Sequence, residues 1–211
     1  MAGDNRNSML EILYLDDYLA AVAKPPGLLV HRTGLDAGET RFALQMLREQ
    51  LGRAVWPAHR LDKGTSGVLL FALDASTART LGLAFEAGEG LRKTYQAVVR
   101  GWPAEQGEID YPLSGASLRG AAKQALTRWR RLATVEVPLP LGRYAQQRYA
   151  LLEVAPETGR YRQIRRHFHH VSHHLLGDTS HGRGDHNRLI RQHYGVHRLL
   201  LHAQGLRLTD P

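Results

Sequence analysis

Short apolar runs separated by turn residues open the chain. Residues 10–14 and 19–23 are apolar runs joined by Asp16-Asp17, a pattern typical of a β-hairpin. Pro25-Pro26 then ends the second run, because proline cannot donate a hydrogen bond to a sheet ladder. The uninterrupted apolar run at residues 68–72 predicts a buried strand.

Apolar residues at helical spacing predict two helices in the same half of the chain. The first covers residues 40–51 and ends at Gly52, and the second runs to about residue 85 after a cap at Asp74 or Ser76. Further along, helical patterns cover residues 159–171 and 188–194, and strand-like patterns cover residues 93–101, 124–137, 148–154 and 199–203.

Strands joined both by hairpins and by helices predict an α+β (mixed α/β) fold, with helices packed on a mixed sheet. We expect a disordered tail at residues 1–9, and one domain over residues 10–211 with a mobile insertion at about residues 107–122. No run approaches the roughly 18 apolar residues of a membrane span, and the start lacks the apolar core of a signal peptide. We therefore expect a cytoplasmic protein.

Positive charge is concentrated in the second half of the chain. Residues 1–105 carry 12 basic and 12 acidic side chains, whereas residues 106–211 carry 16 and 8. Arginine predominates, and its planar group binds phosphates bidentately and stacks on bases. This surplus favours a nucleic-acid partner over the alternative of a solvated basic surface. Because cysteine is absent, thiolate nucleophiles and thiolate metal sites are excluded.

One carboxylate stands between two cations just before the buried strand. Asp62 lies between Arg60 and Lys63 on a glycine-containing turn, and neighbouring positive charge favours its ionised form. It is therefore suited to act as a nucleophile or a base. The alternative is that Asp62 only organises the turn.

Two further groups of residues could serve such chemistry. Arg162, Arg165 and Arg166 would lie close together on a helix, which favours an anion opposite them, either phosphate or Asp62; the alternative is a solvated helix face. Tyr95 alternates with Ala97 and is either a core residue or the wall of an active site.

Nine of the twelve histidines fall between residues 167 and 197. A metal site is disfavoured, because the predicted helix at residues 159–171 carries no carboxylate and the neighbouring side chains are cationic. We expect these histidines to contact RNA or to pack within loops.

Four of these segments, residues 24–31, 59–67, 93–95 and 158–167, resemble motifs of the RluA family of pseudouridine synthases. Gly177-Asp178 and residues 201–203 also fit, and the similarity runs in order from about residue 10 to residue 211. Within the family the chain is most similar to tRNA-modifying members. We expect no N-terminal S4-type RNA-binding domain of the kind that several other members carry.

The resemblance implies a pseudouridine synthase fold and isomerisation of a uridine in structured RNA, without a cofactor or a metal. Asp62 would be the catalytic aspartate. Tyr95 would stack on the uracil and help to remove the proton at C5, and Arg165 would pair with Asp62. The implied partner is RNA, with tRNA favoured over rRNA, and we expect a monomer without membrane contact.

The resemblance also implies residues that bind the RNA and line the pocket. Arg60 would fill the stack left by the flipped nucleotide. The other expected RNA-binding residues are His59, Arg160, Arg162 and Arg166, and the pocket residues are Leu61, Thr65 and Leu201. Arg162 departs from the family, which usually has histidine there, and His174 stands in place of proline.

Three other functions stay open on the sequence. The first is a catalytically idle RNA-binding or RNA-folding protein on the same scaffold, and the second is an rRNA pseudouridine synthase. A metal-dependent nuclease built on the histidines is the third.

Overall fold

The computed structural model describes residues 9–32, 38, 40–88, 90–116 and 121–208. The chain divides into two compact units, residues 1–91 with residues 208–211, and residues 92–207. Most of the tail for which we expect disorder lies outside the described residues. The single domain expected over residues 10–211 stays a prediction.

The first unit begins with the predicted hairpin. Strands β1 (Glu11–Leu15) and β2 (Leu19–Lys24) pair antiparallel, and β2 pairs on its other side with β4 (Ser66–Ala72). The carboxylate of Asp16 closes the turn by accepting hydrogen bonds from the Tyr18 and Leu19 amides at 2.8 and 2.6 Å. The short strand β3 (Trp56–Pro57) pairs with β4.

Two capped helices complete this unit. Helix α1 (Ala43–Leu51) ends at Gly52, whose φ of 63° is easily adopted only by glycine. Helix α2 (Ala75–Ala87) begins at Asp74, which accepts a hydrogen bond from the Thr77 amide at 2.8 Å. Both helices were predicted, although α1 begins three residues later than residue 40.

The second unit is built on long antiparallel strands. Strand β8 (Gln147–Pro156) pairs with β5 (Leu91–Arg100) on one side and with β7 (Leu126–Val137) on the other. Strand β6 (Gln106–Asp110) pairs with β7, and β9 (Leu201–Leu208) neighbours β5. Part of the expected mobile insertion is therefore a strand, and residues 117–120 lie outside the described residues.

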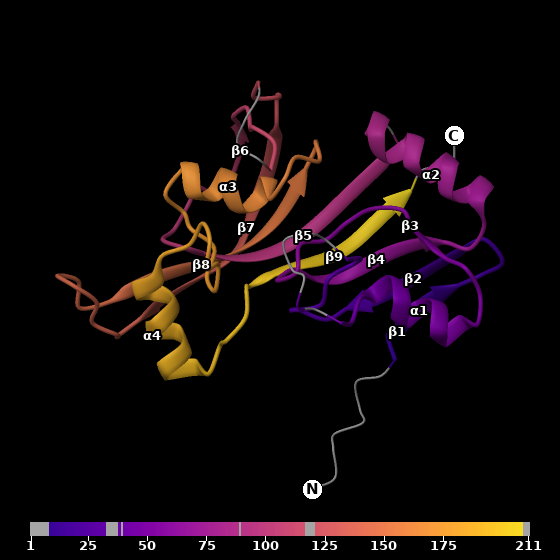
Figure 1. The fold of residues 1–211 in the computed structure, drawn as a ribbon. Coiled ribbons are helices and arrows are strands. Elements are labelled where there is room, and N and C mark those ends of the chain that lie inside the picture. The colour runs from indigo at the N-terminus through magenta and orange to yellow at the C-terminus, as the bar shows by residue number, and fades with distance from the viewer. Residues whose placement is uncertain (1–8, 33–37, 39, 89, 117–120, 209–211) are drawn as a thin grey trace, which may run out of the picture. The chain divides into compact units, whose positions relative to one another are not determined.

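Two helices of the second unit enclose its core. Helix α3 (Gln163–His170) lies over β7 and β8 (Figure 1), where Phe168 packs with Val99 and Leu152. Helix α4 (Gly184–Tyr194) contributes Ile190 to a second apolar group with Val137, Tyr149 and Leu176. Helix α3 is shorter than predicted, because Arg162 adopts a left-handed conformation with φ of 50°.

The predicted α+β class is confirmed. The strand pairs described above are antiparallel within both units, and the described residues contain four helices. None of the helices in the described part of the chain is long and apolar enough to cross a membrane.

Candidate active site

Asp62 is carried by a hydrogen-bonded turn in the first unit. The Asp62 loop, residues 58–65, connects β3 to β4, and the Thr65 amide donates to the Asp62 carbonyl at 3.0 Å. Leu61 and Thr65 are buried on either side of Asp62, which is itself half-buried. Burial of these two neighbours holds the backbone of the loop in place at Asp62.

Lys24 fastens this loop to the turn that follows β2. Its side chain is only 1% exposed, and Nζ donates to the carbonyls of Pro25, Leu28 and Lys63 at 2.9, 2.7 and 3.3 Å. The Gly27 amide also donates to the Lys63 carbonyl, at 2.7 Å. A buried ammonium group is tolerated when its protons meet acceptors in this way. Lys24 therefore holds the backbone next to Asp62.

His59 and Arg60 precede Asp62 and have different surroundings. The His59 ring stacks on Phe85 at 4.9 Å between centroids, and Nε2 accepts a hydrogen bond from the Leu70 amide at 3.2 Å. Arg60 is exposed. Burial, and then the charge of Arg60, lowers the pKa of His31, which places His31 near this arginine. These contacts favour a structural role for His59 and leave Arg60 accessible.

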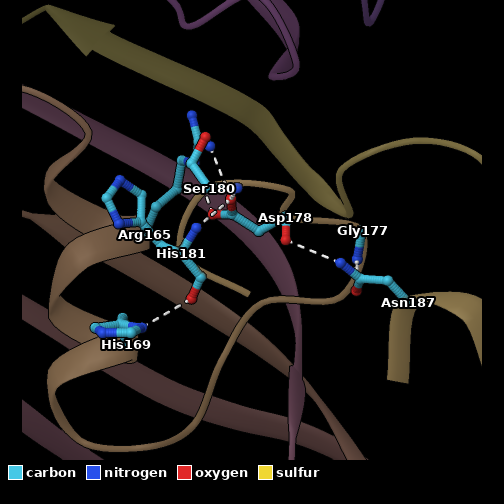
Figure 2. Close-up of polar contacts among 7 residues, drawn as sticks. All are labelled: Arg165, His169, Gly177, Asp178, Ser180, His181 and Asn187. Atoms are coloured by element: carbon cyan, nitrogen blue, oxygen red, sulfur yellow. Dashed lines mark hydrogen bonds and ion pairs between the residues drawn. The ribbon is translucent and has the colours of Figure 1, made fainter. Parts of the chain in front are cut away.

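In the second unit, Arg165 forms a buried ion pair with Asp178 (Figure 2). Arg165 Nε lies 2.7 Å from Asp178 Oδ2, and Nη2 lies 2.7 Å from Oδ1. The Ser180 and His181 amides donate to the same carboxylate at 2.8 and 2.9 Å. Burial alone would raise the pKa of Asp178, but the hydrogen bonds from Arg165 and these amides outweigh it, so the pKa is lowered. Asp178 is thus an ionised partner for Arg165.

The backbone that carries Asp178 is held in turn by Asn187 of α4. The Gly177 amide donates to Asn187 Oδ1 and Asn187 Nδ2 donates to the Asp178 carbonyl, both at 2.8 Å, as Figure 2 shows. Gly177 has a φ of 76°, and a Cβ atom there would lie 1.9 Å from the Arg198 carbonyl oxygen. Only glycine fits at this position. The close packing of Gly177 against Arg198 therefore holds the backbone of the next residue, Asp178, in place beside Arg165.

The second unit also brings Tyr95 and Leu201 to one apolar group. Leu201 is buried in this group with Ile164, the residue before Arg165, and half-buried Tyr95 packs against it. Strand β5 carries Tyr95 opposite Val154 of β8. Three sequence-predicted residues, Tyr95, Arg165 and Leu201, are therefore supported by the same core.

The other arginines of residues 158–167 contact backbone carbonyls or an aromatic ring. Arg160 Nε donates to the Gln124 carbonyl at 3.0 Å, and Arg166 Nη1 donates to the Ser114 carbonyl at 2.7 Å. The Arg162 guanidinium lies over the Tyr161 ring, 4.9 Å from its centroid. Arg160 is exposed, whereas Arg162 and Arg166 are half-buried.

Several histidines of the second unit pack as structural residues. His167 is fully buried between the Thr127 hydroxyl and the Tyr111 carbonyl, at 2.9 and 3.0 Å, and burial lowers its pKa. His170 stacks on Tyr111 at 3.7 Å between ring centroids. Within the described ranges, no group of three or more His, Asp or Glu side chains is placed to hold a metal ion.

Sequence reasoning missed the contacts of Lys24, Asp178 and Asn187. The burial of Lys24 could have been predicted, because the alternation of β2 places it on the same face as buried Ala20 and Val22. The contacts of Asp178 and Asn187 could not, because loops separate these residues from their partners in the sequence. The predicted ion pair of Arg165 with Asp62 stays a prediction: Asp62 belongs to the first unit, and Arg165 and its partner Asp178 to the second.

Comparison with known proteins gives the family. A family model described as RNA pseudouridylate synthase matches residues 18–170. The tRNA pseudouridine synthase C of Vibrio cholerae serotype O1 is 49% identical over 212 residues, covering 96% of this chain and 86% of the relative. The corresponding protein of Yersinia pestis is 46% identical, with 96% and 82% covered.

A solved structure agrees at the level of the fold. Human RNA pseudouridylate synthase domain containing 1 superimposes with a TM-score of 0.75 at 24% identity, over 96% of this chain and 80% of that chain. Since the family match spans more than two thirds of the sequence and close relatives cover nearly all of it, the chain belongs to the RluA-type RNA pseudouridylate synthases, which are isomerases.

Proposed function

We propose that this protein converts one uridine of tRNA, at position 65, into pseudouridine, with Asp62 as the catalytic aspartate. The observation that carries the proposal is the 49% identity to a tRNA pseudouridine synthase C over 96% of this chain. The hydrogen-bonded turn that presents Asp62 supports it. The protein acts as a cytoplasmic monomer that needs neither metal nor cofactor.

The reaction exchanges one glycosidic bond for another. The bond between ribose C1′ and uracil N1 breaks, the uracil turns, and a bond forms between C1′ and C5. The hydrogen at C5 leaves as a proton and N1 gains a proton, so the product has the same composition as the substrate. Asp62 attacks the uridine at the ribose or the base to begin this exchange.

Arg165 and Tyr95 assist Asp62 in the proposed mechanism. Arg165 is 7% exposed and its guanidinium is held at two nitrogens by Asp178, so its position is set before RNA binds. Such an arranged charge orients a carboxylate without reorganisation during the reaction. Tyr95 stacks on the uracil and helps to remove the proton at C5, and Leu61, Thr65 and Leu201 line the pocket.

Positive charge supports RNA binding through the second unit. Residues 92–207 carry 19 basic and 8 acidic side chains, whereas the rest of the chain carries 9 and 12. Arg160, Arg162 and Arg166 contact phosphates, which fixes the position of the RNA without reading its sequence. Exposed Arg60 fills the stack that the flipped uridine leaves, and His59 supports the Asp62 loop.

Release of tritium from tRNA labelled at uridine C5 tests the proposal. We expect the wild-type protein to release tritium from tRNA, and Asp62→Asn to abolish release while leaving tRNA binding intact. Asp17→Asn, which changes an exposed carboxylate in the same unit, is the matched control and should keep the wild-type rate. Replacing uridine 65 by cytidine should also abolish release.

Three results would contradict the proposal or part of it. Unchanged release by Asp62→Asn would exclude this residue as the catalytic aspartate. Salt-dependent tRNA binding by the wild type without any release would favour the catalytically idle RNA-binding protein. Release from rRNA transcripts alone would replace tRNA by rRNA as the substrate.

A further inference from the structure

A buried glutamine joins the loop before α3 to the start of β7. Gln163 is 5% exposed, and its Oε1 atom accepts hydrogen bonds from the Thr158 hydroxyl at 2.7 Å and the Arg160 amide at 2.9 Å. Its Nε2 atom donates to the Leu126 carbonyl at 2.9 Å and to the Thr127 hydroxyl at 3.0 Å. The oxygen of this side chain therefore holds the loop, and the nitrogen holds the strand.

The orientation of the Gln163 amide is dictated by its neighbours. A backbone amide only donates, so Arg160 faces the Gln163 oxygen, and a carbonyl only accepts, so Leu126 faces the nitrogen. The Leu126 amide donates in turn to the Thr158 hydroxyl at 3.1 Å, which joins the two segments directly. A side chain that lacks either a donor or an acceptor would leave one of these segments without its partner.

The loop that Gln163 fastens carries an arginine in a strained conformation. Arg162 has φ of 50° and ψ of 36°, a left-handed conformation that is unfavourable for residues with a Cβ atom. It is the third residue of a turn closed by a hydrogen bond from the Gln163 amide to the Arg160 carbonyl at 3.0 Å, where a positive φ usually requires glycine or asparagine. Among the described residues, only Arg162 and Ser172 have a side chain and a positive φ. Strain of this kind persists where the surroundings enforce it, and it is concentrated at functional sites.

The Arg162 side chain is held in place but has no counter-charge. Its guanidinium lies over the Tyr161 ring, 4.9 Å from the centroid, and the residue is half-buried. No carboxylate in the described part of the chain forms an ion pair with it. Burial lowers the pKa of His181, and the charges of Arg165 and Arg162 lower it further, so both arginines lie near His181. The carboxylate found there, Asp178, is bound by Arg165.

An RNA phosphate is the anion that suits the Arg162 guanidinium. The chain belongs to the RNA pseudouridylate synthases, and this unit carries 19 basic and 8 acidic side chains. A guanidinium binds phosphate through two parallel hydrogen bonds, which requires a defined orientation. The strained backbone at Arg162 provides a defined orientation, and the contacts of Gln163 enforce that backbone.

We propose that Gln163 is a positioning residue for RNA binding: it fastens residues 158–160 to β7 and thereby holds Arg162 in the conformation that presents its guanidinium to a phosphate of the substrate. This inference rests on the proposed function, which assigns Arg162 to a phosphate, and it adds how that contact is prepared. Gln163 itself does not contact the RNA. Loss of its amide therefore weakens RNA binding and leaves the chemical step unchanged.

Steady-state tritium release from tRNA labelled at uridine C5 tests the inference. Gln163→Leu removes both the donor and the acceptor, and Gln163→Glu keeps the shape but places an oxygen against the Leu126 carbonyl. Each variant should raise the KM for tRNA about fivefold or more with kcat within about twofold, since loss of a phosphate contact weakens binding of any RNA sequence. The salt dependence of tRNA binding should fall by about one charge.

Gln147→Leu is the matched control in the same unit. Gln147 is also 5% exposed, and its Nε2 atom donates to the Leu139 and Tyr144 carbonyls at 3.2 and 3.4 Å. Both leucine variants should lower the urea midpoint, because both lose buried hydrogen bonds, but only Gln163→Leu should change the KM. An equal rise in KM for Gln147→Leu would overturn the inference, since general loosening of the unit would then explain both.

A double variant shows whether Gln163 acts through Arg162. Arg162→Gln should raise the KM and reduce the salt dependence as Gln163→Leu does, and the double variant should stay within about twofold of Arg162→Gln. Effects that multiply in the double variant would overturn the inference.

Arg162→Gly gives a result that does not depend on whether the Gln163 variants fold. Glycine relieves the left-handed strain, so the urea midpoint should stay the same or rise while the KM for tRNA increases. A lower midpoint with an unchanged KM would show that Arg162 serves folding alone and would also overturn the inference.

The two proposals fail in different ways. If the wild type releases tritium and the effects of Gln163→Leu and Arg162→Gln multiply, the positioning role is wrong and the proposed function stands. If the wild type binds tRNA without release, the same variants are compared by their dissociation constants for tRNA. Effects that do not multiply would then retain the positioning role while the proposed function fails.

Discussion

Two aspartate–arginine pairs in the second unit have similar geometry and very different surroundings. Asp178 and Arg165 meet at 2.7 Å with side chains 1% and 8% exposed, and Asp185 and Arg183 meet at 2.7 Å with side chains 30% and 51% exposed. Removing one partner of a buried pair leaves an uncompensated charge, whereas an exposed pair is screened by water. Burial therefore decides which of the two pairs matters for stability.

Asp178→Asn should destabilise the protein by about 3–5 kcal/mol, because it leaves the Arg165 guanidinium buried without its counter-charge. Asp185→Asn makes the same substitution at the exposed pair and should cost about 1 kcal/mol or less. Urea unfolding measures both. Equal losses in the two variants would show that the buried pair contributes no more to the free energy of unfolding than the exposed pair does. We also expect Asp178→Asn to slow tritium release under conditions where the protein stays folded.

At the scale of elements, the parts of the fold that carry local signals were predictable. The first hairpin has its Asp16 turn, α1 has Gly52, and α2 has both Asp74 and Gly88. The predicted helix at residues 159–171 is longer than α3, because the hydrophobic pattern does not reveal that Arg162 adopts a left-handed conformation. Strand β6 was missed because its sequence, QGEID, is mostly polar.

The candidate site was predictable only in part, because the contacts that hold its residues join segments far apart in the sequence. Motif similarity marked Asp62, Tyr95 and Arg165 as candidates, but it does not say which groups hold them. The Asp178 carboxylate reaches Arg165 across 13 residues, and Lys24 reaches the Lys63 carbonyl across 39. Such contacts depend on how elements pack, and hydrophobic periodicity carries no information about them.

Lys24 offers a test at this scale, because one side chain joins the turn after β2 to the Asp62 loop. Lys24→Met keeps the apolar stem but removes the ammonium donor from three carbonyls, although the Lys63 carbonyl keeps the Gly27 amide as a donor, so we expect a loss of roughly 2–4 kcal/mol in unfolding free energy. Hydrogen exchange at the Gly27 and Thr65 amides should become faster than in the wild type. Lys123→Met, at an exposed lysine, is the control; equal exchange in both variants would contradict this role of Lys24.

At the scale of the whole molecule, buried neutral histidines link stability to pH. His186 Nε2 accepts a hydrogen bond from Arg100 Nε at 3.0 Å, and since arginine only donates, the ring proton sits on Nδ1, 3.0 Å from the Tyr149 hydroxyl. Burial, and then the charge of Arg100, lowers the pKa of His186 to about 4. Burial also lowers the pKa of His167, His174 and His181.

Stability should therefore fall as pH drops from about 6.5 towards 4. In this window His186 is protonated in the unfolded chain but stays neutral in the folded protein, so acid favours unfolding. Above about pH 6.5 the contribution of His186 to the free energy of unfolding is constant. For His186 alone the loss is on the order of 3 kcal/mol. Urea unfolding at pH 7 and pH 4 measures it. His186→Gln should flatten the pH dependence, whereas His193→Gln, at an exposed position on the same helix, should not.

The close approach of Gly177 to the Arg198 carbonyl also has a consequence for synthesis of the chain. The loop that holds Arg165 is packed against residues made later, because the Leu200 amide donates to the Leu176 carbonyl at 2.9 Å. On the ribosome, the segment around Asp178 thus emerges well before the backbone that encloses it. The arginine that the proposed mechanism needs acquires its final surroundings only after residues 198–200 have left the exit tunnel.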